Sequence, residues 1–330
     1  MNRSQRSAKN RDTLAAQPAM PPTAASLPFS VFLTPRSLPR AEVLPGRVAV
    51  LDVAFAAEGG GSSFQAVTLP FIRGLGVRLA AWVDHHDHER HVDYAHDSRF
   101  VLATKAEHGA CPEMVTPEVV AAAGRVDTLA MNVDLDGIYS GAKWVLGGHE
   151  PYPGADADAR AVDTRRGEPS HRASRIDRAL RARFRDNELK VKVLRYLAAR
   201  TDDPEAWNEI EAAARLIDPL LDEARRLAEQ FQVKHGVAYL HFDMQRPYDK
   251  TELLLLGQQM APVAVVHTSG TISVAADFES GFDFVKMFNM GGGMPTRVSV
   301  AESRLTEVMN KLTAAVAGAT GNDRGHGDST

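Results

Sequence analysis

The sequence predicts an α/β protein: a parallel-sheet domain with helices on both faces, a helical connector, and a smaller α/β C-terminal domain. Three observations lead to this prediction. Apolar runs alternate with helical segments over residues 46–169, a charged helical stretch fills 170–235, and a second group of strand-like runs fills 236–317. Strands that alternate with helices are typical of parallel sheets. With 330 residues, of which 44% are hydrophobic, the chain is long enough for two buried cores.

Residues 1–45 are rich in Ser, Ala, Pro and Arg and contain few acids and no continuous apolar run. This composition predicts a disordered tail, allows a transit peptide as the alternative, and does not favour a secretory signal. In the first domain the patterns predict strands at 47–55, 77–83, 129–133 and 159–162, a helical or irregular segment at 65–76, and helices at 110–115 and from Ser140 to Leu146.

The connector divides sharply by charge. Residues 165–200 carry 12 Lys and Arg against 4 Asp and Glu, whereas residues 201–229 carry 3 against 9. Two interpretations remain open: the helices neutralise one another, or the basic half forms a wall beside a phosphate-binding cleft.

The C-terminal domain is expected to begin near Gly236. Asp249 and Glu252 have the spacing of a helix capping box. The later segments predict a hairpin of strands 263–266 and 271–276, an amphipathic helix at 302–317, and a disordered tail at 318–330.

Bulk properties exclude several classes of protein. A net charge of −4 argues against a chain that coats nucleic acid non-specifically, although a local basic groove is still allowed. No apolar run approaches the roughly 20 residues that a membrane span requires, so we expect no membrane partner. The single cysteine, Cys111, rules out an intrachain disulfide and fits a cytoplasmic location.

Side chains that commonly bind metals stand at the ends of three apolar runs. They are Asp52 in RVAVLDVAF, Asp84, His85 and His86 after LAAWV, and Asp134 and Asp136 after TLAMNV. The carboxyl ends of parallel strands meet at one edge of the sheet, so these side chains should converge. Carboxylates and imidazoles suit Mg, Mn or Zn.

Simpler explanations were weighed for each group. Residues 132–137 match the first half of an EF-hand loop, but Lys143 stands where a bidentate Glu is needed, so we reject a calcium loop. Two explanations remain open: residues 134–137 could form an Asp-rich turn, and residues 84–86 could form a polar surface turn. A zinc site built from the local histidines also remains open, although their spacing fits no structural zinc pattern.

Three motifs together resemble the DHH phosphoesterase superfamily: Asp-His-His at 84–86, Asp-x-Asp-Gly-Ile-x-Ser at 134–140, and Met-Gly-Gly-Gly-Met-Pro at 290–295. The resemblance covers roughly residues 47–302. It implies a metal-dependent hydrolase in which two Mn²⁺ or Mg²⁺ ions activate water. It also implies a catalytic domain at 46–169 and a substrate-binding domain, similar to the DHHA1 accessory domain, at 236–317.

The resemblance also implies roles for individual residues. The metal ligands would be Asp52, as the bridging carboxylate, Asp84, His85, Asp134, Asp136 and Asp163. Asp84, His85 and His86 would form the catalytic set, with His86 beside the substrate phosphate. Gly291, Gly292, Gly293 and Arg297 would bind the substrate, although the glycines equally fit a tight turn and Asp163 equally fits a turn cap.

Two positions and the motif order depart from the family. Asn132 replaces a ligating histidine, Met294 replaces a histidine of the glycine loop, and the Asp-x-Asp motif follows Asp-His-His instead of preceding it, which suggests a permuted core. The expected partner is a phosphate-bearing small molecule or short single-stranded nucleic acid, and a homodimer is compatible with the resemblance. The alternatives are a nucleotide- or nucleic-acid-binding regulator that has lost turnover and an unrelated zinc hydrolase.

Overall fold

The computed structural model describes residues 27–57, 62–243 and 246–322, and two five-stranded sheets organise this part of the chain. The first sheet has the order β1-β6-β2-β3-β5, and every neighbouring pair in it is parallel. Its strands are β1 (Phe29–Leu33), β2 (Val48–Leu51), β3 (Leu79–Asp84), β5 (Phe100–Leu102) and β6 (Thr128–Asn132). The predicted parallel sheet is therefore confirmed.

Side chains alternate in direction along each strand, so both faces of this sheet carry apolar side chains. Helices cover both faces and bury them. Leu51, Val83 and Met131 pack on one face with α2 (Pro117–Ala123) and α3 (Leu135–Val145). Val50 and Trp82 pack on the other face with α1 (Leu69–Leu75), which continues a π-helical turn at Phe64–Thr68.

Four further helices extend the α3 side of the core: α4 (Ala155–Thr164), α5 (His171–Ala182), α6 (Asn187–Ala198) and α7 (Pro204–Arg215). Their opposite charges pair, as Arg175 does with Glu211 and Lys192 with Glu209. These ion pairs favour the interpretation in which the connector helices neutralise one another. Short 3-10 helices occupy Ala41–Val43, Gly76–Arg78, Glu89–Tyr94, Cys111–Met114 and Glu302–Arg304.

The second sheet is mixed and has the order β12-β10-β9-β8-β7. Its strands are β7 (Gln232–Lys234), β8 (Val237–His241), β9 (Val263–Thr268), β10 (Thr271–Ala276) and β12 (Arg297–Ala301). The predicted hairpin is β9–β10. Of the predicted capping box, the N-cap half is present: Asp249 accepts a hydrogen bond from the Glu252 amide at the start of α9 (Lys250–Gln258), whereas the Asp249 amide donates to the Leu220 carbonyl. Helices α10 (Phe284–Met287) and α11 (Leu305–Asn322) complete this domain.

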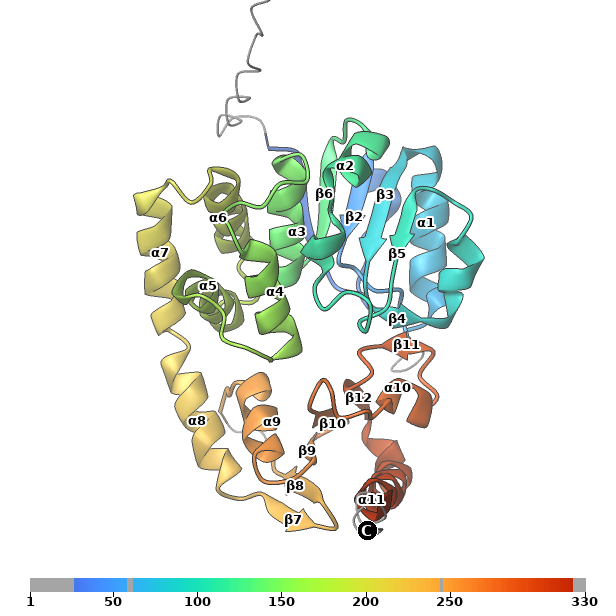
Figure 1. Cartoon of the computed structure of the whole chain (residues 1–330), viewed down its shortest axis with the longest axis vertical. Helices are drawn as coiled ribbons and strands as arrows, with labels where there is room; N and C mark the ends of the chain where they lie inside the picture. Colours follow the sequence, from blue (N-terminus) through green and yellow to red (C-terminus); the bar gives the residue numbers. More distant parts are fainter. Residues whose placement is uncertain (1–26, 58–61, 244–245, 323–330) are drawn as a thin grey trace, which may run out of the picture.

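The two domains are joined on two sides (Figure 1). On one side, α8 (Asp218–Ala228) leads out of the helical layer and packs against α9, so the end of the connector belongs to the C-terminal core. On the other, β4 (Asp87–His88) pairs with β11 (Gly292–Gly293) of the C-terminal domain. Within the described ranges no helix has the length and apolar character of a membrane span.

Four sequence predictions are wrong. The strand expected at 159–162 is part of α4, because Ala155, Ala159 and Val162 lie one helical turn apart and are all buried. Residues 29–33 of the expected N-terminal tail form β1, and α11 extends through residues 318–322 of the expected C-terminal tail. Residues 1–26 and 323–330 lie outside the described ranges. Finally, α3 begins at Leu135 and not at Ser140, because Asp134 caps it.

Candidate metal centre

Polar side chains meet at one edge of the parallel sheet, where four neighbouring strands end. Asn132 ends β6, Asp52 follows β2, Asp84 ends β3, and Lys105 lies shortly after β5. The order β6-β2-β3-β5 places these strand ends side by side, in the position where open α/β sheets build their sites. Asp52 has a φ of 59°, a left-handed conformation that non-glycine residues adopt rarely and often at functional sites.

His85 lies at the centre of the cluster and is completely buried. Its Nε2 atom lies 3.0 Å from Asp136 Oδ2 and 3.3 Å from Asp52 Oδ1. Its Nδ1 atom lies 2.8 Å from the His108 carbonyl, an acceptor that requires Nδ1 to carry a proton. This contact leaves Nε2 facing the two carboxylates, as a second-sphere hydrogen bond orients the free nitrogen of a metal-binding histidine.

His86 lies beside His85 and is the more accessible of the two, with 17% of its side chain exposed. Its Nδ1 atom is 2.8 Å from Asp84 Oδ1 and 3.7 Å from Asp52 Oδ1. Burial raises the pKa of Asp84, but the neighbouring imidazoles, first His86 and then His85 and His91, together hold that pKa below its ordinary value. Asp84 therefore orients His86 as an ionised carboxylate.

Ligand atoms converge in two overlapping groups. Asp52, His85 and His86 form one, and His85, Asp136 and Asp163 form the other, with the ligand atoms of each group within 4.8 Å of one another. Asp84 and Asp134 belong to neither group. The structure thus brings together the residues predicted as ligands, but it places two of them around the rim of the convergence.

Asp134 and Asn132 hold each other through hydrogen bonds. Asp134 caps α3 by accepting a hydrogen bond from the Gly137 amide at 3.2 Å. The Asn132 amide group donates to Asp134 at 3.0 Å and to Asp52 at 3.2 Å, while its own oxygen accepts from the Val133 amide at 2.8 Å. Asn132 consequently presents donors, not a ligand oxygen, to the carboxylates.

The neighbouring cations do not fully balance the negative charge of these carboxylates. Burial, and then Asp136 and Asp134, raise the pKa of Asp52 well above its ordinary value. Burial and Asp136 likewise raise the pKa of Asp134. Among the described residues, Asp52 Oδ1, Asp84 Oδ2 and Asp136 Oδ1 are buried without a hydrogen-bond partner. Repelling carboxylates with unused oxygens, next to two imidazoles, fit a divalent cation such as Mn²⁺ or Mg²⁺.

Sequence reasoning missed one residue of the cluster, Lys105. Its side chain is only 2% exposed, its ammonium group forms an ion pair with Asp163, and its Nζ atom lies 2.8 Å from His85 Nε2. The available signal was the run FVLAT at 100–104, which ends β5 and its following turn immediately before this lysine. Because β5 was not predicted, neither was the lysine beyond it.

The glycine loop reaches the same edge of the sheet from the C-terminal domain. Gly292 pairs with His88, and the Gly291 carbonyl accepts a hydrogen bond from the Glu89 amide at 3.1 Å. Gly291 and Gly293 have positive φ values of 73° and 129°, so the tight-turn explanation of the triplet holds for these two positions. The contacts of the loop join the two domains.

Arg297 follows this loop and lies with Asp163 and Arg165 on a small cavity of about 40 Å³. Among the described residues the Arg297 guanidinium has no hydrogen-bond or ion-pair partner. Burial, and then the nearby cation Arg165, lower the pKa of Arg297 to about 10. Arg165 also pairs with Asp177 at 3.6 Å, whereas Arg297 has no such partner and is suited to binding an anion.

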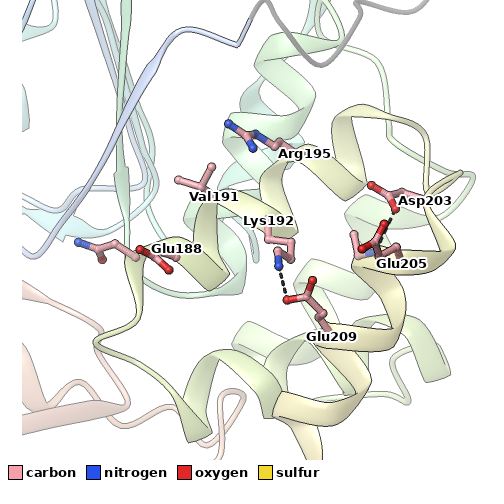
Figure 2. Close-up of a pocket in the computed structure, with 9 residues that line it drawn as sticks. Glu188, Val191, Lys192, Arg195, Asp203, Glu205 and Glu209 are labelled. Carbon is pink, nitrogen blue, oxygen red and sulfur yellow. Dashed lines mark hydrogen bonds and ion pairs between the residues drawn. The ribbon is translucent and has the colours of Figure 1, made fainter.

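A larger cavity, of about 640 Å³, lies between α6 and α7 and is away from this edge. Figure 2 shows that Lys192 and Glu209 point toward each other there and form an ion pair. Its other charged side chains include Glu188, Arg195 and Asp203. None of the residues predicted for the site lines this cavity, so its size does not make it the functional centre.

Comparison with family models gives no match, and comparison with curated proteins gives none. Among solved structures, the chain is similar to a pGpG-specific phosphodiesterase, PggH from Vibrio cholerae, with 12% identity and a TM-score of 0.38 over 59% of this chain and 82% of that one. It is also similar to the exonuclease RecJ, in a structure bound to manganese, with 16% identity and a TM-score of 0.30. That match covers 44% of this chain and 39% of RecJ. Similarity at this level carries no functional conclusion.

Proposed function

We propose that the chain is a metal-dependent phosphoesterase of the DHH type, with the motifs in a permuted order. It hydrolyses a phosphodiester or phosphoanhydride of a nucleotide-like substrate, such as a short oligonucleotide or a cyclic dinucleotide. The observation that carries the proposal is the convergence of Asp52, His85, His86, Asp136 and Asp163 in two overlapping ligand groups at the carboxyl edge of the sheet.

Different residues of the site would have different roles in hydrolysis. A divalent ion bound there supplies Lewis acidity toward the phosphate and the attacking water. Asp52, His85 and Asp136 would hold it, with Asp84 and Asp134 supporting from the rim. His86, oriented by Asp84 and partly accessible, is placed to give a proton to the leaving oxygen.

Recognition of the substrate falls to the C-terminal domain. Arg297 and Arg165 would pair with phosphate oxygens in the cavity that they share with Asp163, and Lys250 adds charge nearby. The glycine triplet at 291–293 would form the adjacent wall, because its pairing with β4 holds it against the catalytic domain.

The test is a hydrolysis assay on the full chain with Mn²⁺ or Mg²⁺. The panel contains bis-p-nitrophenyl phosphate, linear and cyclic dinucleotides, and pyrophosphate. We expect turnover of at least one phosphodiester, and a loss of about 10³-fold or more in Asp136→Asn and Asp84→Ala. Asp222→Asn, which changes an exposed carboxylate on α8, is the control and should keep full activity.

A second function is favoured by Asn132, whose amide donors occupy two carboxylates that would otherwise bind metal. In this case the chain is a nucleotide-binding regulator without turnover. Tight binding of a dinucleotide with no hydrolysis under any divalent metal would establish the regulator and reject the enzyme.

A further inference from the structure

The buried ammonium group of Lys105 lies inside the proposed metal centre. Its Nζ atom is 2.8 Å from His85 Nε2 and forms an ion pair with Asp163. Only 2% of the side chain is exposed to solvent. The Lys105 amide is also fixed, because it donates to Asp87 Oδ2 at 3.2 Å. Both ends of the residue are thus anchored at the site.

The Lys105 side chain ends among carboxylates. Its ammonium group forms an ion pair with Asp163, and His85 Nε2, which it also contacts, lies 3.0 Å from Asp136 Oδ2 and 3.3 Å from Asp52 Oδ1. An ammonium group has three donors and no lone pair, so it cannot act as a metal ligand and repels a cation at the same point.

The lysine affects the two ligand groups differently. Of the group formed by His85, Asp136 and Asp163, it touches His85 and Asp163. Of the group formed by Asp52, His85 and His86, it touches only the shared His85. The cation that the Asp163 side of the cluster requires is therefore already supplied by the chain, whereas the Asp52 side has no such cation among the described residues.

We propose that the Lys105 ammonium takes the place of the second metal ion, so that this chain binds one divalent ion, on the Asp52 side of the cluster. The inference rests on the proposed function and differs from the expectation of two ions. His85 would hold an ion there through Nε2, and Lys105 would keep its ion pair with Asp163.

The experiment counts Mn²⁺ ions per chain on the full protein, by elemental analysis after equilibrium dialysis, together with electron paramagnetic resonance. Two Mn²⁺ ions roughly 4 Å apart couple magnetically, whereas a single ion gives an uncoupled six-line signal. We expect one ion and an uncoupled signal in the wild type. In Lys105→Ala we expect two ions and a coupled signal, and in Lys105→Ala with Asp163→Asn a return to one.

The matched control is Lys190→Ala. Lys190 is also a fully buried lysine, but it lies on α6, where its ammonium group donates to the Phe184 carbonyl at 2.5 Å. Its replacement costs similar packing and should leave the count at one. If Lys105→Ala does not fold, the wild-type count still decides the matter.

Two ions in the wild type would overturn the inference and leave the proposed phosphoesterase intact. One ion in a folded Lys105→Ala variant would also overturn it. No bound Mn²⁺ in the wild type would instead reject the proposed metal-dependent function, and the inference with it.

Discussion

Asp52 shows that the residues of the site are arranged at the expense of stability. Only 1% of its surface is exposed, and its backbone is in a left-handed conformation. Burial, and then Asp136 and Asp134, raise its pKa. A carboxylate whose folded pKa is raised contributes stability only while it is protonated. That contribution is present below the unfolded pKa and is lost as the pH rises through the folded pKa.

We therefore expect Asp52→Asn to raise the melting temperature of the metal-free protein at pH 7.5 by a few degrees, or about 1 kcal/mol. The gain should shrink toward pH 4, where wild-type Asp52 is protonated. The same variant should lose the stabilisation that Mn²⁺ gives the wild type. Melting curves with and without EDTA at several pH values measure both effects. A variant less stable than wild type in EDTA and still stabilised by Mn²⁺ would contradict this account of Asp52.

At the scale of elements, the pairing of β4 with β11 explains the middle glycine of the triplet. Gly292 has an ordinary φ, so its requirement is space and not conformation. A Cβ atom there would lie 2.3 Å from His88 Cδ2 and 2.9 Å from the Asp87 carbonyl oxygen, and the second neighbour is backbone that cannot turn away. Any side chain at this position must separate the two strands.

Gly292→Ala should therefore weaken the contact between the domains by about 1–3 kcal/mol. We expect faster hydrogen exchange in residues 87–89 and 291–293 and a lower affinity for substrate. Gly318→Ala on α11 is the matched control, because nothing lies within 4 Å of its added Cβ and its φ is ordinary. Equal exchange in the two variants would show that the β4–β11 pairing does not hold the domains together.

The sequence predicts elements well where one pattern dominates. The apolar runs that became β2, β3 and β6, the N-cap of α9 at Asp249 and the β9–β10 hairpin were all recognisable. The short strands β1 and β5 were missed, because three to five residues carry little periodicity and their pairing is decided by the neighbouring strand. The helix α4 was misassigned because four of its residues also fit a short apolar strand.

The site was predictable to the same extent. Side chains at recognised strand ends were found, whereas Lys105 was missed with its strand. Arg165 was missed because it stands in a charged segment whose partners come from a distant part of the chain. The orientation of the Asn132 amide depends on three-dimensional neighbours that no sequence pattern reports.

At the scale of the whole molecule, the two domains meet where the metal centre and the cation group face each other. Arg166 spans the boundary through ion pairs with Asp277 and Glu279, which are exposed and contribute little individually. The cavity between Asp163 and Arg297 measures about 40 Å³, about the volume of one water molecule. A phosphate group is larger than this cavity, so we expect the residues around it to move when a phosphate-bearing substrate enters.

Arg297 should consequently couple ligand binding to the stability of the whole chain. Its half-buried guanidinium forms no hydrogen bond or ion pair among the described residues, so the unliganded protein carries a cation without a direct partner. Arg297→Met keeps the bulk of the side chain and removes the charge. We expect its melting temperature without ligand to equal or exceed that of the wild type. Pyrophosphate in EDTA, which should stabilise the wild type by more than about 1 kcal/mol at concentrations well above its Kd, should stabilise the variant by much less.

Pyrophosphate also binds divalent metal ions, so the calorimetry is done in EDTA, where no free metal ion contributes to the difference between the variants. Arg225→Met, on the exposed face of α8, is the control for loss of a positive charge and should respond to pyrophosphate as the wild type does. An equal response in Arg297→Met would place the anion site elsewhere. Because Arg297 belongs to the C-terminal sheet and Asp163 to the catalytic domain, loss of the response in this variant alone would mean that an anion bound between the domains stabilises the whole fold.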